Sequence, residues 1–151
     1  MVKPFTALAA ALLLLSACSP KPTEVGDLNE TEVTFPSGKT VTAETMLRDI
    51  DQARGMMFRD SLAKNRGMLF VHPKDAAYTY WMYQVRIPLD IIWMDHQRRI
   101  VEISANTPPC PSKLAHECPS FGGHETARYV LELTGGGAAM YGLKVGDTLS
   151  F

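Results

Sequence analysis

The sequence has no excess of positive charge, with 15 Lys and Arg against 16 Asp and Glu and a formal net charge of -1. Nucleic-acid-binding domains neutralise phosphates with clustered basic side chains, so we expect no nucleic-acid partner. The sequence also lacks a nucleophile elbow, a P-loop, a dinucleotide fingerprint and a paired Ser-His-Asp arrangement. No motif therefore indicates a reaction, and we expect no cofactor.

The apolar run near the N-terminus is too short to cross a membrane. It extends over residues 5–15, after the single charge of Lys3. As a helix it would span roughly 16 Å, about half of the hydrocarbon core. This pattern predicts a signal peptide over residues 1–17.

The tetrapeptide Leu15-Ser16-Ala17-Cys18 resembles the lipobox of bacterial lipoproteins, in which the cysteine is acylated and becomes the first residue. Several acyl chains hold a protein on a membrane durably. We therefore expect the membrane to be a partner through lipid on Cys18. The alternative is an ordinary secretory signal followed by an incidental cysteine.

Two features of residues 18–30 add detail to the expected membrane attachment. Ser19 stands where lipoproteins retained at the inner membrane often carry Asp, which favours the outer membrane, facing the periplasm. Residues 18–30 are rich in Pro, Thr and Gly and have no apolar cluster, which is typical of a flexible tether.

Residues 31–151 predict a single mainly β (α+β) domain, a compact antiparallel β-barrel or sandwich with one or two short helices. A hairpin is expected at residues 32–35 and 39–43, with a short helix that Asp49 and Gln52 cap and Gly55 ends. A second short helix is expected at residues 138–141. The further strands are expected at residues 67–71, 76–83, 99–105 and 127–134, with a last one ending at Phe151.

The apolar run WMYQVRIPLDIIWMD, residues 81–95, reads as two strands joined at Ile87-Pro88. Its polar residues Gln84, Arg86 and Asp90 must reach solvent or find hydrogen-bonding partners. Asp90 lies between two apolar residues. It either accepts backbone hydrogen bonds or pairs with an arginine, or it lines a pocket as a carboxylate with a shifted pKa.

Cys110 and Cys118 lie in a long loop rich in proline. Because the expected compartment is oxidising and Cys18 is used for lipid, a disulfide is the leading interpretation. The alternatives are a zinc or copper site formed with His116 and His124, and a catalytic thiolate.

Seven methionines beyond Met1 raise a copper-binding alternative, because thioether is a soft ligand for Cu(I). They are dispersed through apolar segments rather than clustered. Packing in the core is therefore the favoured role.

Six ordered blocks, RGMMFRDSL, GMLFVHP, YWMYQVRIPLDIIWMD, TPPC, ARYVLEL and LKVGD, resemble those of the domain-of-unknown-function family numbered 192 (DUF192). The resemblance covers residues 40–151 and implies a compact, mostly β domain, in bacteria often secreted or lipid-anchored, without an established activity. Where the family usually reads Lys-Asn-Thr, this chain has Tyr83, Gln84 and Val85. The resemblance thus implies that a cation and a small hydroxyl are lost here.

Three functional hypotheses follow. The first is a lipid-anchored, non-catalytic module that binds an envelope ligand or protein. Its candidate binding residues are Arg59, Trp81, Gln84, Asp90 and Arg128. The second is an envelope hydrolase with Asp90 as general base. The third is periplasmic metal handling through Cys110, His116, Cys118 and His124.

Overall fold

The computed structural model describes residues 29–151 of the 151-residue chain. The expected signal peptide, Cys18 and most of the expected tether lie outside these residues. The first strand, β1, begins at Glu30, one residue before the expected start of the domain. Within the described part, no helix has the length and hydropathy needed to span a membrane.

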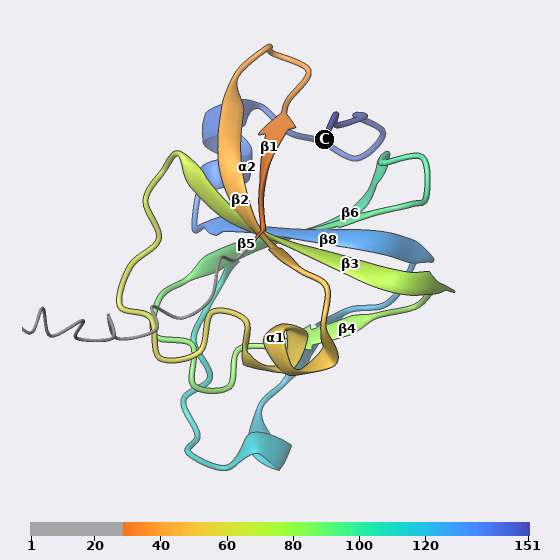
Figure 1. Ribbon diagram of the computed structural model, residues 1–151. Coiled ribbons are helices and arrows are strands. Elements are labelled where there is room, and N and C mark those ends of the chain that lie inside the picture. The colour runs from red at the N-terminus through yellow and green to blue at the C-terminus, as the bar shows by residue number, and fades with distance from the viewer. Residues whose placement is uncertain (1–28) are drawn as a thin grey trace, which may run out of the picture.

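Six strands form one sheet in the order β1-β2-β3-β8-β5-β6. Neighbouring strands are antiparallel except β2 and β3, which pair in parallel. The sheet does not close into a barrel, and the layers on its two faces give a sandwich-like body (Figure 1). The strands are β1 Glu30–Thr34, β2 Thr40–Met46, β3 Arg66–Ala76, β5 Leu89–Met94, β6 Ile100–Thr107 and β8 Ala127–Thr134.

Short elements cover the two faces of this sheet. The ribbon β4 (Thr79–Trp81) and β7 (Ser120–Gly122) lies on the same side as α1 (Asp49–Arg54), whereas α2 (Gly137–Tyr141) lies on the other (Figure 1). We call these the β4 face and the α2 face. The mainly β fold with short helices is therefore confirmed, together with one 3₁₀ turn, Ala115–Glu117.

Each face of the sheet has its own hydrophobic core. Along β8, Leu131 and Leu133 pack on the α2 face, and Val130 packs on the β4 face. This is the alternation expected of a strand, but here both sets of side chains are buried. Met56, Met68 and Met82 fill the core of the β4 face, in agreement with a packing role for methionine.

Several strand boundaries differ from the sequence-based expectation. The strand expected at residues 76–83 is reduced to β4, and residues 82–88 form no strand, because the chain turns at Tyr83 and Gln84, where Gln84 adopts a positive φ of 56°. β3 continues past Pro73 to Ala76, with an irregularity in its pairing after Val71. The expected final strand is only two isolated bridges, at Thr148 and Ser150.

The expected capping box of the first helix was also wrong. α1 follows Arg48 in an extended conformation without a side-chain cap, although Gly55 does end the helix. The Gln52 side chain instead reaches across to the sheet, where its Nε2 donates to the backbone oxygens of Met46 (3.1 Å) and Val71 (2.9 Å). It therefore fixes α1 onto the β4 face.

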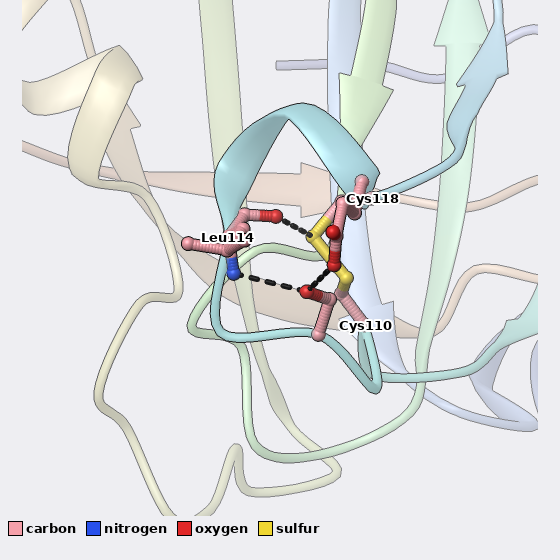
Figure 2. Close-up of a disulfide and its surroundings, with 5 residues drawn as sticks. Cys110, Leu114 and Cys118 are labelled. Carbon is pink, nitrogen blue, oxygen red and sulfur yellow. Dashed lines mark hydrogen bonds between the residues drawn. A yellow bond between two sulfur atoms is a disulfide. The ribbon is translucent and has the colours of Figure 1, made fainter.

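The expected disulfide joins Cys110 and Cys118 (Figure 2). Within the closed loop, the Cys118 sulfur lies 3.8 Å from the Leu114 carbonyl oxygen, and the Leu114 amide donates to Ser112 at 3.0 Å. The Cys110 amide donates to the Met82 carbonyl at 3.2 Å. The disulfide thus closes the loop, and the hydrogen bond of the Cys110 amide attaches it beside β4.

This disulfide-closed loop leads directly into β7, which pairs with β4. Gly122 ends β7 against the Trp93 ring, where a Cβ atom would come within 2.1 Å of that ring. Only glycine permits so close an approach. The disulfide loop, β7 and Trp93 together therefore fix the position of β4.

Candidate functional site

A cavity of about 170 Å³ opens on the β4 face, between α1, the segment that follows it, and β4. Its walls contain the aromatic side chains of Phe70, Tyr80, Trp81 and Tyr83, with Met56 among its apolar residues. An engineered cavity of roughly 150 Å³ holds one benzene molecule. The cavity is therefore large enough for a small organic molecule.

Glu132, on β8, is the buried carboxyl group of this cavity. The residue is only 5% exposed, and Met68 and Ile91, both fully buried, flank it on the neighbouring strands. Among the described residues, no group donates to or accepts from its Oε2. A buried polar atom without a partner costs about 1–3 kcal/mol, so its retention at a cavity is typical of a functional group.

Burial raises the pKa of Glu132 to about 8, against a smaller lowering by the charge of Arg59. Arg59 itself is bound by Glu44, in a bidentate pair at 2.6 and 2.7 Å. Glu132 is consequently protonated at neutral pH in the free protein. It can donate a hydrogen bond, or it can ionise when a cation enters.

His72 and Tyr80 form a polar pair next to Glu132. The His72 Nε2 atom lies 3.1 Å from the Tyr80 hydroxyl, and the His72 ring stacks on Tyr78 at a centroid distance of 3.6 Å. Burial lowers the pKa of His72, so its imidazole is neutral at pH 7. Burial, with the charges of Glu132 and Tyr78, raises the pKa of Tyr80 well above its usual value. Both groups are thus neutral hydrogen-bonding groups.

Gln52 contributes an acceptor to the same cavity. Its Nε2 hydrogens are used on Met46 and Val71, so the side-chain carbonyl is the group that remains for a ligand. The cavity thus combines aromatic walls with a few convergent polar groups, which is the usual composition of a small-molecule site.

Of the five candidate binding residues expected from the sequence, Trp81 lines the cavity and is 43% exposed. Arg59 lines an adjoining hollow with its partner Glu44. Gln84 accepts the Phe58 amide through its backbone carbonyl (2.9 Å), and Arg128 lies 3.4 Å from Asp75. These residues do not converge on one site.

Asp90 is fully buried on the α2 face, opposite Glu132. Its Oδ1 accepts the amides of Asn106 (2.7 Å) and Gly136 (3.1 Å), and its Oδ2 accepts that of Ala138 (2.7 Å). The carboxylate therefore fixes the glycine turn and the start of α2 to β5. This is the structural alternative for Asp90, and the geometry gives no support to its use as a general base.

The metal alternative also gains no support. The disulfide uses both thiols, and the His124 Nδ1 atom lies 2.6 Å from Glu102 on β6. Within residues 29–151, no group of three or more His, Cys, Asp or Glu side chains is arranged to hold a metal ion.

Sequence reasoning missed Glu132, His72, Tyr80 and Gln52 as site residues. The only sequence signal was at Glu132, a lone acidic residue on the strand face that also carries Val130. Two positions at which the chain departs from the expected family pattern, Tyr83 and Val85, also line the cavity.

The fold is that of a small, mainly β domain with a cavity on one face of its sheet. The chain belongs to the DUF192 family, described as "Uncharacterized ACR", whose model matches residues 32–151. A comparison with curated proteins gives no significant match.

Two solved structures share this fold. A protein of unknown function from Novosphingobium aromaticivorans DSM 12444 is 32% identical, with a TM-score of 0.71, over 89% of this chain and 94% of that one. A protein from Sinorhizobium meliloti 1021, described as a putative transcription regulator, is 27% identical, with a TM-score of 0.70, over 83% of this chain and 97% of that one.

Proposed function

We propose that this protein is a non-catalytic small-molecule-binding module of the bacterial cell envelope, anchored by lipid on Cys18. The observation that carries the binding role is the unpartnered, buried Glu132 carboxyl in a cavity with aromatic walls. A ligand donor that enters the cavity would give this group a partner, so binding would recover the free energy that its burial costs.

The geometry favours binding over catalysis. His72 is the residue of the cavity best suited to act as a general base. Its imidazole, however, lies within hydrogen-bonding distance of the Tyr80 hydroxyl and stacks on Tyr78. It therefore serves to position Tyr80 rather than to activate a nucleophile. Asp90, the base of the hydrolase hypothesis, faces the opposite side of the sheet.

The description of the Sinorhizobium protein as a transcription regulator does not change this proposal. A net charge of -1 gives no electrostatic support for binding DNA phosphates.

A screen of several hundred small molecules by protein-observed NMR tests the binding role. We expect hits to shift the amides of Gly55, His72 and Glu132, which line the cavity. Trp81→Ala should weaken these hits roughly tenfold, because a large aromatic contact is lost. The control is Phe58→Ala, since Phe58 is an exposed aromatic residue outside this cavity. Hits confined to other surfaces, or no hits, would contradict the proposal.

Fractionation of cells that express the full chain tests the lipid anchor. We expect the wild type in the membrane fraction, with acyl chains on Cys18 detected by mass spectrometry. Cys18→Ser should move the protein to the soluble periplasmic fraction. The matched control, Cys110→Ser with Cys118→Ser, should stay on the membrane. Equal membrane attachment of the wild type and Cys18→Ser would rule out the anchor.

A further inference from the structure

The charges around the cavity indicate which ligand it takes. Besides Glu132, the charged or titratable residues that line it are His72, Tyr80, Tyr83 and Arg54. Burial keeps His72 neutral, and Arg54 is exposed to solvent. Arg59, whose charge also reaches Glu132, is paired with Glu44. Among the described residues that line the cavity, Glu132 is thus a buried carboxyl group, and Arg54, which is exposed, is the one cation.

An anionic ligand does not fit this arrangement. A carboxylate or phosphate beside Glu132 would need a charged donor, but Arg54 is exposed to solvent and Arg59 already has both of its terminal nitrogens on Glu44. An anion would also repel Glu132 at any pH at which that residue ionises.

Three features of the cavity favour a cationic ligand. Aromatic rings attract cations through their faces, and Phe70, Tyr80, Trp81 and Tyr83 form the walls. Glu132 supplies the counter-charge. Once ionised, the Glu132 carboxylate is an acceptor, as is the side-chain carbonyl of Gln52, and N–H groups can donate to both. A primary ammonium has three such donors, whereas a quaternary ammonium has none.

We propose that the cavity binds a small primary amine as its ammonium ion, with the N–H groups on Glu132 and Gln52 and the apolar body against Trp81 and Tyr83. This inference rests on the proposed binding function and names its ligand class. The volume of about 170 Å³ limits the enclosed part to roughly the size of a benzene ring.

Binding of an amine should release one proton from Glu132. Below pH 8 the free protein carries a protonated Glu132, and the amine in solution carries its own proton. When the two form an ammonium–carboxylate pair, the Glu132 proton leaves to solvent. The groups that face Glu132, namely Arg59, His72 and Tyr80, keep their charge states, so the release is close to one proton per ligand. The affinity should therefore rise with pH up to about 8.

Benzylamine, benzyl alcohol and benzoate form a matched set of probes that differ mainly in charge. For the wild type at pH 8 we expect benzylamine to bind at least roughly tenfold tighter than benzyl alcohol. Its affinity should fall by up to about tenfold per pH unit below pH 8, and that of the alcohol should not. Calorimetry in buffers of different ionisation enthalpy measures the released proton.

Glu132→Gln should remove both the preference for the amine and its pH dependence. Glu102→Gln is the matched control, since Glu102 is a mostly buried carboxylate outside the cavity, and it should retain both. If benzyl alcohol or benzoate shifts the cavity amides as strongly as benzylamine, the amine inference fails and the small-molecule function stands. If no probe and no library member shifts those amides, both the amine inference and the proposed small-molecule function fail.

Discussion

Asp90→Ala lowers the free energy of unfolding by about 3–5 kcal/mol, the loss expected when one partner of a buried charged network is removed. The Asp90 carboxylate is fully buried and accepts three backbone amides, from Asn106, Gly136 and Ala138. Truncation leaves these three donors without a partner. The effect is large because small domains are stable by only about 5–15 kcal/mol.

Urea unfolding monitored by tryptophan fluorescence measures this loss. If Asp90→Ala does not fold, Asp90→Asn retains one acceptor oxygen and should lose about 2 kcal/mol. Asp60→Ala is the control, because Asp60 pairs with Arg86 at 2.8 Å on the surface with 80% of its side chain exposed. That change should cost less than about 1 kcal/mol. An Asp90→Ala loss no greater than that of Asp60→Ala would contradict the structural role.

The second large effect concerns Glu132 and pH. In the folded protein its pKa is raised from 4.5 to about 8. Between these two values the folded state holds a proton that the unfolded state has lost, so the free energy of unfolding falls as pH rises. The expected fall from this one group is up to about 1 kcal/mol per pH unit between pH 5 and pH 8, and it ends above pH 8.

Comparison with Glu132→Gln isolates this contribution, because glutamine has nearly the same shape and does not titrate. Other groups, such as His72 with its lowered pKa, contribute equally to both proteins and cancel in the difference. Urea titrations at pH 5, 6, 7 and 8 should show the wild type losing stability relative to the variant at each step. A constant difference, or one of opposite sign, would show that Glu132 is ionised throughout.

The sequence was sufficient to predict those features of the fold that depend on local patterns. The hairpin of β1 and β2, the alternation along β8 and the end of α1 at Gly55 follow from turn residues and periodicity, and the disulfide follows from the even number of cysteines that remain if Cys18 is acylated. The parallel pairing of β2 with β3 could not be predicted in this way, because it depends on long-range order in the sheet.

The site was harder to predict for the same reason. Asp90 was correctly singled out as a polar group that needs partners, but its partners come from β6 and the glycine turn, far away in the sequence. Glu132 looks like a solvent-facing residue between Leu131 and Leu133. Only the position of β8 between β3 and β5, with both faces covered, shows that its carboxyl is buried at a cavity that Tyr80 and Trp81 also line.

A crystal structure of the protein with the tightest hit from the screen tests the central claim most directly. We predict that a donor atom of the ligand lies within about 3 Å of Glu132 Oε2, the usual length of a hydrogen bond, with the ligand body against Trp81. A ligand bound elsewhere on the domain, with Glu132 Oε2 still unpartnered, would contradict the assignment of this cavity as the binding site.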